Sequence, residues 1–132
     1  MSGHPLVLIV DDNDRNRKLV REVLRAALFR TLEAATAAEA TALASEHLPH
    51  VVLLDLRLPD ADGTEAVRAL RTHPRTSAIP VVAVTALRLN HLDAWLSDSG
   101  FAGYIPKPID IETLPGLVRG FVPARTTDRP SR

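Results

Sequence analysis

Acidic, hydroxyl and ammonium side chains stand directly after short apolar runs of the sequence. Such runs are typical of strands that are buried on both faces of a parallel sheet. The carboxyl ends of parallel strands meet at one edge of the sheet, where ligands bind. We therefore expect the side chains that follow these runs to lie close together: Asp11, Asp12, Asp55, Thr85 and Lys107.

Three carboxylates in one place predict a cation. At an effective dielectric constant of about 20, each close pair repels by roughly 4 kcal/mol, so a fold holds them only with a cation or a strongly raised pKa. Oxygen ligands suit Mg²⁺, which takes one or two carboxylates and keeps several waters. Asp55 would then be a nucleophile toward phosphorus, Lys107 and the metal would neutralise the phosphoryl oxygens, and Thr85 would bond one of them. This pattern predicts a phosphoryl-transfer site without a separate catalytic base.

Each of these residues also has an ordinary structural explanation. An acid after a strand often forms a turn or caps a helix, a threonine at a strand end often packs, and a Lys-Pro pair is often a loop. The functional interpretation depends on their coincidence at consecutive strand ends of one short chain.

Strand and helix patterns alternate five times along the chain. The predicted strands cover residues 6–10, 31–35, 51–54, 81–84 and 102–105. The predicted helices cover residues 15–29, 36–48, 64–71, 88–99 and 113–121. This alternation predicts an α/β fold, a doubly wound five-stranded parallel sheet with helices on both faces.

Local signals predict how some helices begin and end. Thr36 followed by Glu39 is a capping-box pattern, Gly100 stands where a helix would end, and Pro115 fits only in a first turn. In the first helix, six apolar residues are expected to face the core: Leu19, Val20, Val23, Leu24, Ala27 and Leu28.

Composition excludes several classes of protein. The 132 residues include 16 basic and 16 acidic side chains and no cysteine, so a basic nucleic-acid surface, a disulfide framework and a thiolate metal site are not expected. No run has the length of a membrane span. We expect one domain over residues 4–121, a flexible tail over 122–132, and a cytoplasmic protein that binds neither nucleic acid nor membrane.

Four stretches together resemble one family. They are Val-Asp-Asp-Asn at 10–13, Leu-Leu-Asp-Leu-Arg-Leu-Pro-Asp-Ala-Asp-Gly at 53–63, Val-Thr-Ala at 84–86 and Gly-Tyr-Ile-Pro-Lys-Pro at 103–108. With them the chain resembles the CheY-like receiver domains of response regulators, from about Pro5 to Phe121. The resemblance implies a flavodoxin-like sheet with strand order 2-1-3-4-5.

The same resemblance implies roles for the acids. Asp55 would be the phosphoacceptor, Asp12 and Asp55 direct Mg²⁺ ligands, and Asp11 a ligand through water. The backbone carbonyl of Arg57 would be a further ligand. The Arg57 side chain is unusual at this position, and we expect it to tune autodephosphorylation.

The resemblance also implies a switch. Thr85 and Tyr104 are similar to the pair in which the hydroxyl moves toward the phosphoryl group and the ring turns inward. Lys107 would pair with phosphoryl oxygens, and the Lys107-Pro108 bond is similar to one that is cis in the family.

The expected protein is a stand-alone response regulator of a two-component system or phosphorelay, which catalyses only its own phosphorylation and dephosphorylation. Its phosphodonor would be a sensor histidine kinase or a histidine phosphotransfer protein. It would act on a protein target through residues 88–121, as a monomer or as a phosphorylation-dependent homodimer. Trp95, in that region, either packs at a helix flank or anchors an interface.

Three other interpretations remain open from the sequence. A pseudo-receiver would bind partners without phosphorylation. An aspartate-nucleophile phosphohydrolase would carry a second aspartate at position 57, where this chain has arginine. A nucleotide-binding domain would have a glycine-rich loop after the first strand, which this chain lacks.

Overall fold

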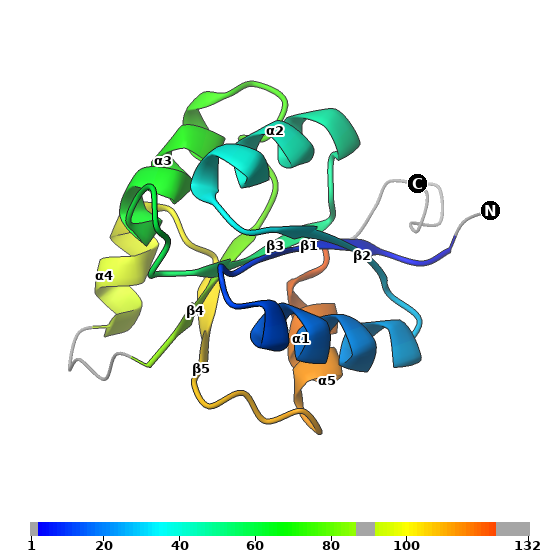
Figure 1. Ribbon diagram of the computed structural model, residues 1–132. Helices are drawn as coiled ribbons and strands as arrows, with labels where there is room; N and C mark the ends of the chain where they lie inside the picture. The colour runs from blue at the N-terminus through cyan, green and yellow to red at the C-terminus, as the bar shows by residue number, and fades with distance from the viewer. Residues whose placement is uncertain (1–2, 87–91, 124–132) are drawn as a thin grey trace.

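Five parallel strands form one sheet in the order β2-β1-β3-β4-β5 (Figure 1). The structure, a computed structural model, describes residues 3–86 and 92–123. The strands are β1 (Leu6–Val10), β2 (Arg30–Ala34), β3 (Val51–Asp55), β4 (Val81–Thr85) and β5 (Gly103–Pro106). The helices are α1 (Asp14–Ala26), α2 (Ala37–His47), α3 (Gly63–Thr72), α4 (Leu92–Ser99) and α5 (Leu114–Phe121). The predicted fold class and strand order are confirmed.

Helices cover both faces of the sheet (Figure 1). α1 and α5 pack on one face, in the core cluster that contains Val7 and Ile9. α2, α3 and α4 pack on the other face, in the cluster that contains Leu8 and Val10. Alternate residues of β1 therefore enter opposite layers, as the two-residue period of a strand requires. β1, β3 and β4 are buried along their whole length, and because they run parallel, the polar residues at their carboxyl ends meet at one edge of the sheet.

The first helix is shorter than predicted. α1 ends two residues before Leu28, which has a φ of 73° and is 64% exposed. This left-handed residue turns the chain into β2, and Phe29, only 3% exposed, fills the core instead. The buried stripe of α1 is also narrower than expected, because Val20 and Leu24 are buried while Leu19 is 46% exposed. The prediction that Leu19 and Leu28 face the core is therefore wrong.

Two predicted helix ends agree with the structure. Gly100, at the end of α4, has a φ of 104°, a conformation that glycine adopts without strain. Pro115 lies in the first turn of α5. The start predicted for the fourth helix, residue 88, lies outside the described residues, as do residues 124–132 of the predicted tail.

The capping box predicted for α2 forms in a modified way. The Thr36 hydroxyl accepts a hydrogen bond from the Glu39 backbone amide at 3.1 Å. The Glu39 carboxylate accepts from the amide of Ala35 at 2.8 Å, one residue before the N-cap.

A second carboxylate, from the β3–α3 loop, completes the start of α2. The two oxygens of Asp60 accept hydrogen bonds from the amides of Ala37 and Ala38 at 2.8 and 3.0 Å. These amides have no acceptor within the helix, and they hold the pKa of Asp60 below its ordinary value of 3.8. Asp60 therefore ties the loop that follows β3 to α2.

Replacing Asp60 with alanine is expected to destabilise the protein in a pH-dependent way. Because the folded-state pKa of Asp60 is lowered, its stabilisation is fully present above 3.8 and is lost as the pH falls through the lowered value. The difference in urea midpoint between wild type and Asp60→Ala is thus expected to shrink between about pH 7 and about pH 3. The control is Thr36→Ala, which removes a cap of the same helix that does not titrate. If the difference in urea midpoint between wild type and Asp60→Ala stays constant with pH, the Asp60 carboxylate does not stabilise the start of α2 as its ionised form.

Candidate functional site

Three carboxylates lie together at the carboxyl end of the sheet. Asp11, Asp12 and Asp55 each offer an oxygen, and these oxygens lie within 4.8 Å of one another. The reason is the register of two neighbouring strands. Val10 of β1 is paired with Leu54 of β3, and the residue after each of them is an aspartate. Asp11 and Asp55 are buried and Asp12 is exposed. The acidic cluster that the strand ends predict is therefore present.

Backbone amides hold both buried carboxylates in similar turns. Oδ1 of Asp11 accepts from the amide of Asn13 at 2.9 Å, and Oδ1 of Asp55 accepts from the amide of Arg57 at 2.9 Å. Each acid bonds the amide two residues ahead, which is the bond of an Asx turn. These turns fix the side chains where the strands end.

One ammonium group contacts the cluster. Nζ of Lys107 lies 3.0 Å from Oδ2 of Asp55, and the Lys107 backbone amide donates to the carbonyl of Thr85 at 2.8 Å. β5 is paired with β4, so the residue that follows β5 reaches the same edge as Thr85. The Lys107-Pro108 peptide bond is cis, as the resemblance implied. Lys107 compensates one of the three negative charges.

The negative charge that Lys107 does not compensate is unfavourable for the ionised form of Asp11. Burial raises the pKa of Asp11, and the charge of Asp55 raises it further, although the Asn13 amide and Lys107 act in the opposite direction. A divalent cation would relieve both effects, since it replaces lost hydration and separates like charges. Three carboxylates whose oxygens lie within 4.8 Å of one another, two of them on buried residues, are a donor set that fits Mg²⁺.

A cleft of about 560 Å³ opens beside the acids. Asp55, Thr85 and Lys107 line it together with Arg57 from the β3–α3 loop and Trp95 from α4. Trp95 is 38% exposed, and it also borders the site. Leu56, Asp62, Gly63, Thr64 and Ala86 complete the described lining.

Tyr104 lies apart from these residues. Its side chain, on β5, is 37% exposed and is not among the described residues that line the cleft. Thr85, by contrast, is buried at the end of β4. The structure therefore holds the hydroxyl of the predicted switch pair at the site and the aromatic ring at the surface.

Sequence reasoning missed the caps of the β3–α3 loop. Asp62 caps α3: its carboxylate accepts from the Glu65 amide at 3.0 Å, and the Glu65 carboxylate accepts from the Asp62 amide at 3.4 Å. An aspartate followed three residues later by glutamate is a capping-box spacing, so this signal was present. The contact of Asp60 with α2 spans more than twenty residues and has no local signal.

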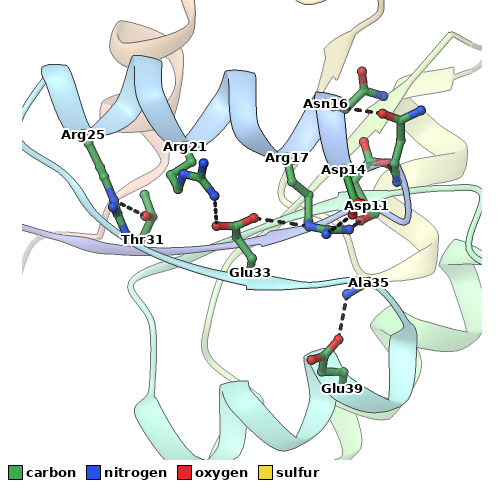
Figure 2. Close-up of polar contacts among 11 residues, drawn as sticks. Asp11, Asp14, Asn16, Arg17, Arg21, Arg25, Thr31, Glu33, Ala35 and Glu39 are labelled. Carbon is green, nitrogen blue, oxygen red and sulfur yellow. Dashed lines mark hydrogen bonds and ion pairs between the residues drawn. The ribbon is translucent and has the colours of Figure 1, made fainter.

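Sequence reasoning also missed the contacts of Arg17, an α1 residue whose guanidinium reaches the turn after β1 (Figure 2). One of its partners, Glu33, lies on β2, 16 residues away along the chain.

Comparisons with known proteins agree on one family. Residues 7–119 match the sequence model of the response regulator receiver domain. The polar-differentiation response regulator DivK of Brucella ovis is 33% identical over 116 residues, which cover 88% of this chain and 94% of DivK.

Solved structures give the same result. Chemotaxis response regulator CheY4 of Vibrio cholerae superposes with a TM-score of 0.84 at 27% identity, covering 90% of this chain and 99% of CheY4. The receiver domain of sensor histidine kinase PA1611 from Pseudomonas aeruginosa PAO1 has a TM-score of 0.79 at 26% identity, covering 91% of this chain and 98% of that domain. That structure has a magnesium ion coordinated in its active site cleft. In the part of this chain that the structure describes, no helix combines the length and apolar character that a membrane span needs.

Proposed function

The chain belongs to the response regulator receiver domain family of two-component signalling, and from this premise we propose that Asp55 accepts a phosphoryl group from a partner's phosphohistidine. The observation that carries the proposal is the contact between Asp55 and Lys107 inside the acidic cluster, with 3.0 Å between Oδ2 and Nζ. This contact supports the proposal, because it joins the carboxylate that we take as the nucleophile to an ammonium group, within a cluster of three carboxylates.

The residues at the site suit the chemistry of phosphoryl transfer. Asp12 and Asp55 would bind Mg²⁺ directly, Asp11 through water, and Arg57 through its backbone carbonyl. When bound, the ion supplies positive charge for the phosphoryl oxygens. A carboxylate oxygen of Asp55 forms a bond to phosphorus while the phosphorus–nitrogen bond of the donor breaks, and the electron pair leaves with the imidazole. Lys107 pairs with a phosphoryl oxygen.

The acyl phosphate then biases two arrangements of the domain. The acyl phosphate carries up to about two negative charges and three acceptor oxygens at this edge of the sheet, in place of the single charge of the Asp55 carboxylate. Thr85 donates a hydrogen bond to one of these oxygens, and the exposed ring of Tyr104 turns inward behind it. The output surface comprises α4, β5 and α5, with Trp95 at its border with the cleft.

The partners follow from this chemistry. The donor is a sensor histidine kinase or a histidine phosphotransfer protein, and the target is a protein that binds the output surface. The domain spans residues 4–121, is cytoplasmic, binds neither nucleic acid nor membrane, and is a monomer or a phosphorylation-dependent homodimer. Beyond its own phosphorylation and dephosphorylation it catalyses no reaction.

Trp95, the chain's only tryptophan, offers a direct test. Because its ring borders the cleft, we expect its fluorescence to change saturably with Mg²⁺, and again with beryllofluoride, a mimic of the phosphoryl group. EDTA reverses both changes, and calorimetry gives the same Mg²⁺ affinity. Asp55→Asn is the blank for beryllofluoride. If the chain is a pseudo-receiver, beryllofluoride has no effect on wild type, and the proposal fails.

Arg57 is expected to prolong the life of the phosphoryl group. Its exposed side chain lines the cleft two residues after Asp55, where its bulk and charge hinder the attacking water. Arg57→Asn is expected to shorten the phosphoryl half-life roughly tenfold, about 1.4 kcal/mol in barrier height. The loss of label with time measures it, and Arg57→Lys separates charge from shape. An unchanged half-life in Arg57→Asn would rule this role out.

A further inference from the structure

The guanidinium of Arg17 connects three parts of the fold (Figure 2). Nη1 donates to the backbone carbonyl of Asp11 at 2.7 Å, in the turn after β1. Nε donates to the carboxylate of Glu33 on β2 at 3.2 Å, and Nη2 pairs with Asp14 in the first turn of α1. The side chain of Arg17 is only 16% exposed, and its bonds to Asp11 and Glu33 are partly buried, whereas Asp14 is 88% exposed.

The contact with the Asp11 carbonyl lies where the sheet ends. The Asp11 amide donates to the carbonyl of Ala34 at 3.0 Å, and Ala34 is the last residue of β2. Asp11 lies just beyond Val10, the last paired residue of β1. The guanidinium of Arg17 connects the Asp11 carbonyl to α1 and β2.

That carbonyl controls the direction of a second acid. The carbonyl of Asp11 and the amide of Asp12 belong to one peptide plane, which is rigid. A bond that holds the carbonyl therefore restricts rotation on both sides of the plane, and with it the direction in which the Asp12 side chain leaves the backbone. One guanidinium thus constrains two of the three carboxylates.

We propose that Arg17 is a positioning residue for the Mg²⁺ site, which holds the Asp11–Asp12 peptide so that both carboxylates face Asp55. This inference rests on the proposed function, because it takes the acidic cluster to bind Mg²⁺. Arg17 is not a ligand, and it acts through the turn after β1.

Charge and position have opposite effects on Mg²⁺ affinity, which makes the proposal testable. A positive side chain near the cluster repels Mg²⁺, so its removal would strengthen binding if charge alone mattered. Loss of positioning weakens binding instead, typically by 10- to 100-fold for residues that orient metal ligands. The sign of the change separates the two effects.

Arg21 is a matched control on the same helix. Its Nη1 lies 2.7 Å from the other oxygen of Glu33, and within the described part of the chain it makes no hydrogen bond to residues 11–13. Burial alone would raise the pKa of Glu33, but the bonds from Arg21 and Arg17 hold it below the ordinary value, so the carboxylate is ionised. Arg21→Gln therefore removes a cation and a bond to Glu33 without touching the turn.

The experiment compares the Mg²⁺ dissociation constants of full-chain wild type, Arg17→Gln and Arg21→Gln by calorimetry, with urea unfolding to establish that each is folded. We expect about tenfold weaker binding for Arg17→Gln and a change of less than about twofold for Arg21→Gln. If Arg17→Gln does not fold, it is replaced by Arg17→Lys, which keeps the charge but lacks the planar five-donor fork of the guanidinium; the expected direction is the same.

Two results would overturn the role of Arg17: Arg17→Gln binds Mg²⁺ as tightly as wild type or more tightly, or Arg21→Gln is weakened equally. Absence of Mg²⁺ binding in wild type is a different result, since it removes the proposed function itself.

Discussion

Asparagine at position 55 is expected to abolish phosphoryl uptake altogether. Asp55 is the only member of the acidic cluster that contacts Lys107 in the described structure, and it lies at the centre of the sheet edge, at the end of β3. The amide that replaces it is neutral and a poor nucleophile, so no acyl phosphate forms. Incubation with acetyl phosphate and Mg²⁺, followed by intact-protein mass spectrometry, measures the result. We expect the added phosphoryl mass in wild type and none above background in Asp55→Asn.

Asp98→Asn is the matched control for this variant. Asp98 is an exposed residue of α4, outside the acidic cluster, and its replacement makes the same chemical change. It is expected to be labelled like wild type. Label retained by Asp55→Asn would show that another residue accepts the group, and the assignment of Asp55 would be wrong.

The second large effect is expected at Lys107. Its Nζ supplies positive charge to the carboxylate that would become the acyl phosphate. Removal of one such preorganised donor commonly lowers rates by about 10²–10³-fold. Lys107→Ala is therefore expected to take up phosphoryl groups about 10²-fold more slowly. Its Mg²⁺ affinity is not expected to fall, because the variant has lost a cation that repels the metal.

Rates of labelling from acetyl phosphate and calorimetric Mg²⁺ affinities check both parts of this prediction. Lys18→Ala is the control, since Lys18 is the other lysine of the chain and is exposed on α1. A Lys107→Ala variant that is labelled as fast as wild type would show that the contact with Asp55 has only a structural role.

The order of the elements and the positions of the strand-end residues could be predicted from the sequence alone. A strand buried on both faces must be continuously apolar, so β1, β3 and β4 are visible as runs, and the polar residue after each run marks its end. Parallel pairing then brings those ends to one edge. This is why the sequence predicts that Asp55 and Lys107 lie together, although they are 52 positions apart along the chain.

The contacts that hold the site in shape were decided by the tertiary structure. Arg17 reaches the Asp11 carbonyl and Glu33, and Asp60 reaches α2, only because helix, strand and loop pack at particular distances. The left-handed turn at Leu28 likewise depends on where β2 must pair with β1. Periodicity records which face of an element is buried, but a hydrogen bond between distant side chains depends on rotamers and packing that no local pattern encodes.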